Sequence, residues 1–360
     1  MNISKIVRPH LVNFKGFEPA DPLEVMAKRA GISAGDIIRL NANENPYGPS
    51  PQVAEALASI TTNIYPDPQQ RNARHAISEY TGLEYESILI GAGSDEIIDL
   101  LFRLIVESGD SVIECTPTFG MYGFGASLAG ANCKSIPRDN KWNIDIPATL
   151  AAVDSSTKMI LLNSPNNPTG NITPIEQVEQ LLATGVLVVV DEAYYEFAGE
   201  TVADLVNKHE NLVVLRTMSK WAGIAGLRVG YGMMSPELVG YLLDIKQPYN
   251  VNTAGEAALL ASLADSTYLI RNVDKIVAER ERLFKMLDTI PNIKPWPSRG
   301  NYILCSFKVG KAEEIFSKFV RRGIFLRRFS HDRLQDCIRI SVGKPSQTDA
   351  LVAALNEIIV

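Results

Sequence analysis

Short, unbroken runs of apolar and β-branched residues constrain the fold of this chain more than any other feature. They predict five strands, at 87–90, 111–115, 159–163, 186–190 and 212–215. Their apolar residues do not alternate with polar ones, which is typical of strands covered by helices on both faces. Helical patterns separate them, at 95–106, 120–129 and 175–184. The alternation predicts an α/β fold with a largely parallel sheet, to which 228–234 adds an antiparallel strand.

The pattern changes after Gln247-Pro248. A long helical region from about 253 to 287 is followed by two strand patterns and two helical patterns, at 302–307, 338–342, 312–322 and 348–358. This grouping predicts a smaller α+β lobe. The proline-containing N-terminal segment predicts an arm and one helix, at 22–30. We therefore expect an arm with a helix (1–38), a large domain (39–250) and a small C-terminal domain (251–360).

Composition excludes several classes of function. The net charge of −6 and the acidic isoelectric point of about 5.4 argue against a surface for nucleic acids or anionic membranes. The four cysteines form no CxxC pair, which argues against a disulfide framework or a structural zinc site and favours a reducing cytoplasm. The four histidines lack metal-binding spacing, so no metal is expected. Neither a secretory signal nor an apolar run of membrane-spanning length is expected.

Polar clusters follow the predicted strands, where ligands bind in open α/β sheets. The first cluster is GAGSDE at 91–96, with Gly93, Ser94 and Asp95 at the start of a predicted helix. Its glycines permit a tight turn, and the free N–H groups of a helix N-terminus favour an anion such as phosphate. The motif fits neither a dinucleotide fingerprint nor a P-loop. A helix cap without a ligand is the alternative interpretation.

Two further clusters carry amides and a carboxylate. SPNNPTG at 164–170 fixes a turn and offers Asn167 as a donor, although a plain turn would have a similar composition. Asp191 ends an apolar strand, and a carboxylate there is costly unless it has a partner. A protonated ring nitrogen would be one, and Tyr194 could donate to an oxygen on the same ring. Metal binding is the rival interpretation and lacks histidine support.

The remaining clusters supply an amine and an aromatic ring. The strand at 212–215 leads to Thr217, Ser219 and Lys220, with Arg228 eight residues beyond the lysine. A lysine among hydroxyls and close to an arginine suits an amine bonded to an aldehyde beside a phosphate; the alternative is a solvated turn. Phe119 follows another strand and could stack on a flat cofactor or pack in the core.

Together these clusters match pyridoxal 5′-phosphate, which has one phosphate, one ring nitrogen, one ring oxygen and one aldehyde. We expect Lys220 to bond to the aldehyde and later to carry a proton at the substrate Cα. Asp191 would keep the ring nitrogen protonated, which makes the ring an electron sink. Asn167 and Tyr194 would contact the ring oxygen. The phosphate would be held by Arg228, Thr217, Ser219 and the turn around Gly93, Ser94 and Asp95.

The chain resembles the fold-type I aminotransferases, and most closely the histidinol-phosphate aminotransferase family. The matching segments span nearly the whole chain in order: LNANENP at 40–46, YPD at 65–67, GSDE at 93–96, FGMY at 119–122, SPNNPTG at 164–170, DEAY at 191–194, RTMSK at 216–220, GLRVGY at 226–231 and IRISVG at 338–343. The resemblance implies a large domain with a mostly parallel, seven-stranded sheet and a smaller α+β domain.

The resemblance also implies a homodimer with shared active sites, in which Tyr65 reaches the cofactor phosphate of the partner subunit. Asn43 would line the substrate end, and Arg339 and Arg327 would bind the substrate anion. That anion is a carboxylate in most relatives and a phosphate in this branch. The chain departs from the pattern at Phe119, where relatives often carry tyrosine. The adjacent Arg328 leaves open which arginine of the pair contacts substrate.

The activity implied is transamination of L-histidinol phosphate with 2-oxoglutarate, giving imidazole-acetol phosphate and L-glutamate. An aromatic amino-acid aminotransferase and a threonine-phosphate decarboxylase remain alternatives on the same scaffold, because fold and cofactor do not fix the substrate. A non-catalytic ligand sensor built on the same fold is an alternative of a different class. Lys220 and Asp191 favour an enzyme.

Overall fold

A seven-stranded sheet forms the centre of the larger lobe in the computed structural model, which describes residues 2–14, 16, 19 and 21–359. Its strands lie in the order β2 (Ile88–Gly91), β8 (Gly230–Met233), β7 (Leu212–Thr217), β6 (Leu187–Asp191), β5 (Thr157–Asn163), β3 (Ser111–Thr116) and β4 (Asn132–Pro137). Only β8 runs antiparallel to its neighbours. The predicted α/β fold and its antiparallel strand are confirmed.

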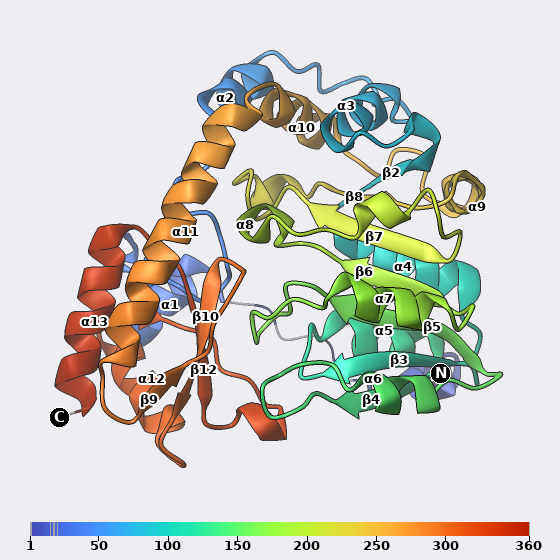
Figure 1. Ribbon diagram of the computed structural model, residues 1–360. Coiled ribbons are helices and arrows are strands. Elements are labelled where there is room, and N and C mark those ends of the chain that lie inside the picture. The colour runs from blue at the N-terminus through green and yellow to red at the C-terminus, as the bar shows by residue number, and fades with distance from the viewer. Residues whose placement is uncertain (1, 15, 17–18, 20, 360) are drawn as a thin grey trace.

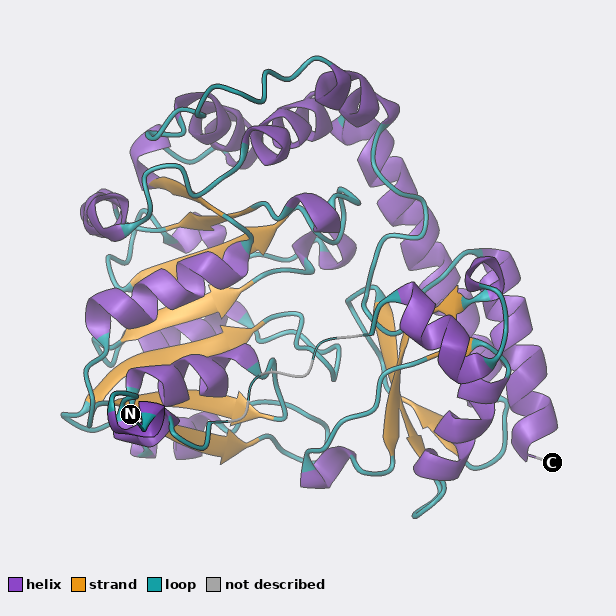
Figure 2. Ribbon diagram, turned by 180° about the vertical axis from the view of Figure 1, so that it is seen from behind, coloured by secondary structure: helices purple, strands orange, loops and turns teal. Residues whose placement is uncertain are grey.

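Helices cover both faces of this sheet, as the unbroken apolar strands predicted (Figures 1 and 2). Val189 packs with one layer and its neighbours Val188 and Val190 with the other, because successive strand side chains point to opposite faces. The first layer comprises α4 (Ser94–Ile105), α5 (Met121–Ala129) and α9 (Pro236–Ile245). The second comprises α3 (Arg71–Thr81), α6 (Ile146–Ala151), α7 (Ile175–Leu182), α8 (Tyr195–Ala198) and α10 (Thr253–Ala264).

The predicted helical region at 253–287 is two helices rather than one. The first, α10, packs on α3 and on α2 (Pro51–Ala58), and the second, α11 (Ser266–Asp288), crosses to the smaller lobe (Figure 1). Asp265 separates them with a non-helical backbone. Its carboxylate accepts a 2.5 Å hydrogen bond from the hydroxyl of Ser50, which is also the N-cap of α2. A tertiary contact thus sets this boundary.

The smaller lobe is built from both ends of the chain. Its three-stranded antiparallel sheet has the order β12 (Cys337–Ser341), β10 (Tyr302–Phe307) and β9 (Ile293–Pro295), and α12 (Ala312–Arg321) and α13 (Pro345–Ile359) pack beside it. The N-terminal helix α1 (Leu23–Ala30) packs on α12, and β1 (Ile38–Arg39) pairs in parallel with β11 (Ile324–Phe325). The division of the chain at residues 38 and 250 stays a prediction.

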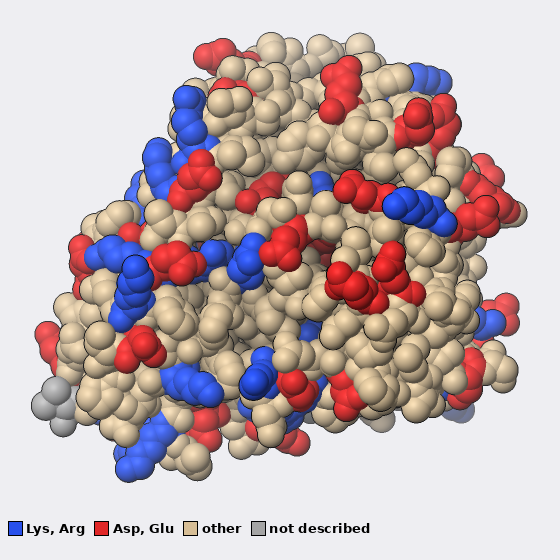
Figure 3. Space-filling view, in the orientation of Figure 1, with Lys and Arg blue, Asp and Glu red and all other residues tan. Residues whose placement is uncertain are grey.

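The surface is mixed in charge. Figure 3 shows acidic and basic side chains interspersed over the face of the molecule seen in Figure 1. None of the helices among the described residues combines the length and apolar character that crossing a bilayer requires. The four cysteines are free thiols.

Candidate active site

The five predicted polar clusters meet at one edge of the large sheet, facing the smaller lobe. They do so because the parallel strands end side by side, with Asn163 of β5 paired in register with Asp191 of β6. A cavity of about 750 Å³ opens there. Its walls include most of the predicted site residues: Asn43, Ser94, Asp95, Phe119, Asn167, Asp191, Tyr194, Thr217, Ser219, Lys220, Arg228, Arg327 and Arg339.

Lys220 lies in the turn after β7, and its side chain enters the cavity. Its Nζ donates a hydrogen bond of 3.2 Å to the carbonyl oxygen of Ala42. Burial, followed by the positive charge of Arg339, lowers the pKa of Lys220 to about 8. A larger share of this amine is therefore uncharged near neutral pH than for a surface lysine, as a nucleophile requires.

Asp191 ends β6, a strand that is buried from its second residue onward, and its carboxylate lines the cavity. Its two hydrogen-bond donors are uncharged: the Tyr122 hydroxyl at 3.0 Å and the Ala193 amide at 3.0 Å. Burial raises the pKa of Asp191 to about 7 despite these bonds. A cationic group at this point of the cavity would therefore gain a strong partner.

The turn before α4 forms an anion cradle with Arg228. Gly93 adopts a left-handed φ of 81°, and a Cβ at that position would lie 2.6 Å from Nη2 of Arg228. Arg228 donates to the Ser219 hydroxyl at 3.3 Å and pairs with Asp95 at 3.0 Å. The guanidinium thus lies against the N-terminal turn of α4, and both present donors to an anion. Gly93 itself is not part of the cavity wall.

Asn167, Tyr194 and Phe119 surround the space between Lys220 and Asp191. Oδ1 of Asn167 accepts a 2.6 Å hydrogen bond from Arg339, which leaves the amide N–H groups of Asn167 available as donors. The Tyr194 hydroxyl accepts from Asn43 Nδ2 at 3.0 Å and keeps its own proton to donate. Phe119 lines the cavity and contacts Tyr122 edge-on, with ring centroids 5.7 Å apart.

The end of the cavity formed by the smaller lobe is cationic. Arg339 on β12 is only 6% exposed, and its Nη2 donates to the Asn41 carbonyl at 2.6 Å. Its backbone pairs with that of Arg327, which brings the two predicted arginines together. Arg328 lines the same cavity and pairs with Glu313 of α12. The Nε groups of Arg339 and Arg328 are buried and without a hydrogen-bond partner among the described residues.

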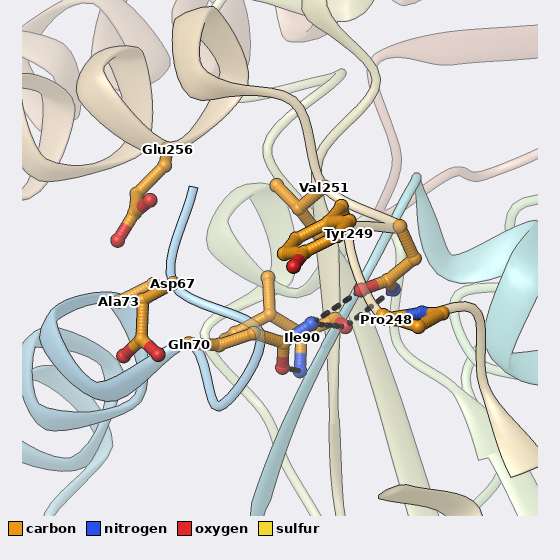
Figure 4. A pocket seen from close by; sticks show the side chains of 9 residues that line it. Asp67, Gln70, Ala73, Ile90, Pro248, Tyr249, Val251 and Glu256 are labelled. Atoms are coloured by element: carbon orange, nitrogen blue, oxygen red, sulfur yellow. Dashed lines mark hydrogen bonds between the residues drawn. The ribbon is translucent and has the colours of Figure 1, made fainter. Parts of the chain in front are cut away.

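Tyr65 lies apart from the other predicted residues. It is 76% exposed and stacks on Tyr249 with ring centroids 4.3 Å apart. Tyr249 lines a small pocket together with Gln70, shown in Figure 4. Gln70 exchanges two hydrogen bonds with the backbone of Ile90, at 2.7 and 3.1 Å. Tyr65 is not among the residues that line the active-site cavity of its own chain.

Tyr122 is the functional side chain that the sequence interpretation left without a role. It is a fully buried residue of α5, and its hydroxyl is the nearest side-chain donor to Asp191. The signal lay in the FGMY segment, which places a tyrosine in the first turn of the helix that follows the aromatic residue at the strand end. Other cavity residues not predicted include Asn41, Glu44, Glu114, Thr118 and His331, whereas Arg328 was one of the two arginines between which the sequence left the choice open.

Among the described residues, no group of three or more His, Cys, Asp or Glu side chains is arranged to hold a metal ion. The carboxylate at position 191 has a tyrosine and a backbone amide around it instead.

Comparison with known proteins identifies the family. The profile of aminotransferase class I and II matches residues 35–355. The chain belongs to this family. The aminotransferase is 45% identical to a histidinol-phosphate aminotransferase of Roseiflexus castenholzii, with 99% of each chain covered. It is 44% identical to the chloroplastic histidinol-phosphate aminotransferase of Nicotiana tabacum, with 97% of this chain and 86% of the tobacco protein covered.

Solved structures confirm the fold-type I architecture of the aminotransferase. The histidinol-phosphate aminotransferase of Sinorhizobium meliloti, crystallised with pyridoxal 5′-phosphate, superimposes with a TM-score of 0.88 at 28% identity. The match covers 98% of this chain and 96% of that protein. The predicted resemblance and the predicted enzyme class are therefore confirmed.

Proposed function

We propose that this aminotransferase transfers the amino group of L-histidinol phosphate to 2-oxoglutarate, giving imidazole-acetol phosphate and L-glutamate. The names of its relatives at 43–45% identity over nearly the entire chain support this activity. So does the cavity, which joins an amine at one end to a cluster of arginines at the other. The cofactor in this proposal is pyridoxal 5′-phosphate.

The residues present fit that cofactor. A pyridinium nitrogen would supply the cationic partner that the buried carboxylate of Asp191 lacks. The cradle of Ser94, Ser219 and Arg228 suits its phosphate, and Thr217, Gly93 and Asp95 shape that cradle. Asn167 and Tyr194 offer donors for its ring oxygen, and Phe119 a flat surface for its ring. When bound, the cofactor supplies an electron sink that lets bonds at the substrate Cα break.

Lys220 carries the proton chemistry in this proposal. Its amine lies in the cavity with a pKa lowered to about 8, near the operating pH of a general base. The amine would take the proton from the substrate Cα and return it at the carbon bonded to nitrogen on the cofactor side. The Ala42 carbonyl, which accepts from Nζ, is placed to orient the amine between transfers.

The positive charge of the arginines at the substrate end is the observation that favours one substrate over the others. Arg327, Arg328 and Arg339 line one end of the cavity, and the buried Nε groups of the last two lack partners among the described residues. A phosphate monoester is largely dianionic at neutral pH and has three acceptor oxygens, whereas a carboxylate has one charge and two oxygens. The cluster therefore favours histidinol phosphate over an aromatic amino acid.

A panel of amino donors tests the proposal. The values of kcat/KM for L-histidinol phosphate, L-phenylalanine and L-threonine phosphate should rank histidinol phosphate first. L-threonine phosphate also offers a phosphate, and CO2 release from it would instead support the decarboxylase. The proposal fails if either competitor has the higher kcat/KM, or if histidinol phosphate is not converted.

The proposal extends to a homodimer in the cytoplasm. Tyr65 and two large side chains near it, Ile64 and Tyr249, are exposed in the single chain. A second copy of the chain would cover them and would bring Tyr65 to the partner's cofactor phosphate. Four free thiols fit a reducing compartment. Light scattering at micromolar concentration should give twice the mass of one chain, and a single-chain mass would contradict the shared site.

A further inference from the structure

Arg138 is a buried cation without an acidic partner. It follows β4 directly and is 2% exposed. Its guanidinium donates to three uncharged acceptors: the Cys115 carbonyl at 2.9 Å, the Trp142 carbonyl at 3.1 Å and Oδ1 of Asn166 at 3.0 Å. None of the ion pairs in the described part of the chain involves Arg138. Because burying an unpaired charge is costly, such an arginine needs a reason to be retained.

One side of Arg138 braces the wall of the active-site cavity. Asn166 is 0% exposed, and all its side-chain atoms are used: Oδ1 accepts from Arg138 and Thr118, and Nδ2 donates to Pro117 and Thr169. The next residue, Asn167, accepts the 2.6 Å hydrogen bond from Arg339. Arg138 therefore fixes Asn166. The next residue, Asn167, in turn orients Arg339 at the substrate end.

The other side of the same segment is held by the smaller lobe. The Arg333 guanidinium donates to the Arg138 and Asp139 carbonyls and lies 4.6 Å above the Trp142 ring. Arg333 comes two residues after His331, the last residue of the cavity-lining run 327–331. The segment 138–142 thus connects the two walls of the substrate end, Asn167 on the large lobe and 327–331 on the small lobe.

We propose that Arg138 is a positioning residue for the substrate anion: through Asn166 it sets Asn167 and Arg339, and through its own backbone it holds Arg333 and the arginine-bearing loop. The inference rests on the proposed function, because it assumes that the anion at this end belongs to the amino donor. A guanidinium is suited to the task because its N–H groups diverge in one rigid plane toward three separate acceptors. A lysine would keep the charge and lose that geometry.

The test compares Arg138→Lys and Arg138→Gln with wild type, using L-histidinol phosphate and L-histidinol as amino donors. We expect the ratio of their kcat/KM values to fall about 10- to 100-fold in both variants, because misplacing a binding group by about 1 Å costs on that order. The loss should appear mainly in KM for the phosphorylated donor. Arg74→Lys is the matched control: Arg74 is 5% exposed and also donates to backbone carbonyls, but it lies outside the cavity walls. Its ratio should stay at the wild-type value.

Two outcomes overturn the inference. If Arg138→Lys keeps the wild-type ratio of the two kcat/KM values, the charge of Arg138 matters and the geometry of its hydrogen bonds does not. If both donors lose rate equally, Arg138 is structural. Should the Arg138 variants not fold, Arg333→Gln decides, because Arg333 is only partly buried and its loss should lower the ratio about 3- to 10-fold in the same direction.

A separate measurement distinguishes failure of the inference from failure of the proposed function. A wild-type enzyme without preference for histidinol phosphate over histidinol contradicts the proposed substrate. The inhibition constant of inorganic phosphate against the amino donor, measured on the cofactor-loaded enzyme, still tests Arg138. It should rise in Arg138→Lys and stay unchanged in Arg74→Lys; an unchanged constant in both contradicts the positioning role.

Discussion

The Tyr122 hydroxyl donates a 3.0 Å hydrogen bond to Oδ2 of Asp191. This bond joins the first turn of α5 to the last residue of β6 and fixes the carboxylate that faces the cavity. It is an uncharged contact, so it orients Asp191 without neutralising it. Asp191 therefore depends on a cationic ligand for full stabilisation, and this dependence can be measured.

The cofactor-free protein should lose stability as the pH rises between about 4 and 7. The pKa of Asp191 is raised from 3.8 to about 7, so the folded state holds a proton that the unfolded state has released in this range. The stabilisation is complete below pH 4 and is lost as the pH passes 7. Melting temperatures at pH 4, 5, 6, 7 and 8 measure the slope.

Asp191→Asn should reduce this slope, and bound cofactor should also reduce it by pairing the carboxylate. A smaller slope of the same sign should remain, because burial raises the pKa of Glu196 to about 8. Asp99→Asn is the control, because Asp99 is an exposed carboxylate on α4 that does not line the cavity. A slope in Asp191→Asn equal to that of the wild type would contradict the role of Asp191.

Lys220→Ala should abolish transamination, with a loss of at least about 10⁴-fold, the upper range of a general base alone. The visible absorption band of a lysine-linked cofactor should disappear with it. Borohydride reduction followed by peptide mass spectrometry would locate the linkage in wild type. Lys246→Ala is the comparison, because Lys246 is a second buried lysine with a lowered pKa that lies outside the cavity. A linkage that survives Lys220→Ala would place the anchor on a different lysine.

Gly93→Ala should weaken cofactor binding by about tenfold or more, because its new Cβ would push the Arg228 guanidinium from the cradle. Gly82→Ala is the control: φ is also positive there, at 74°, and no atom lies within 4 Å of the added Cβ. Both variants should lose unfolding free energy from backbone strain: about 1 kcal/mol at Gly82, which is in the left-handed region, and more at Gly93, whose ψ of 164° lies in a region essentially confined to glycine. Fluorescence titration of the cofactor-free protein should show a raised dissociation constant for Gly93→Ala only.

The three arginines of the substrate end should differ in their contribution. Arg339→Gln should lower kcat/KM for histidinol phosphate by about 10²- to 10³-fold, the range for losing one partner of a buried charged contact. Arg328→Gln should cost less, because Arg328 shares its charge with Glu313. Arg327→Gln completes the series. Equal losses for phosphorylated and unphosphorylated donors would show that these side chains do not read the phosphate.

The strand pattern predicted most of the fold because buried strands carry an unbroken apolar signal. The edge strand β4 was not predicted: its residues Asn132, Lys134 and Ser135 are polar and largely solvent-facing, as an edge strand permits. The break at Asp265 escaped prediction for a different reason. It depends on a hydrogen bond to Ser50, more than 200 residues away in sequence.

The site was predictable where chemistry and strand ends coincide, as at Lys220, Asp191 and Arg228. Tyr122 and Arg138 were not, because nothing local marks a tyrosine on a helix or an arginine after an edge strand as functional. Their roles come from partners at Asp191 and Asn166, brought close by the sheet order. The role proposed for Tyr65 requires a second subunit, so a single chain cannot show it.

The pairing of β1 with β11 has a consequence for how the molecule forms. The strand β1 is synthesised long before its partner, which belongs to the last third of the chain. Contacts of such high sequence separation form late and slow the search for the native state. The segment from β1 to Glu44, which lines the active-site cavity, therefore cannot settle until the C-terminal sheet exists. The catalytic centre should be the last part of the nascent protein to mature, whichever lobe collapses first.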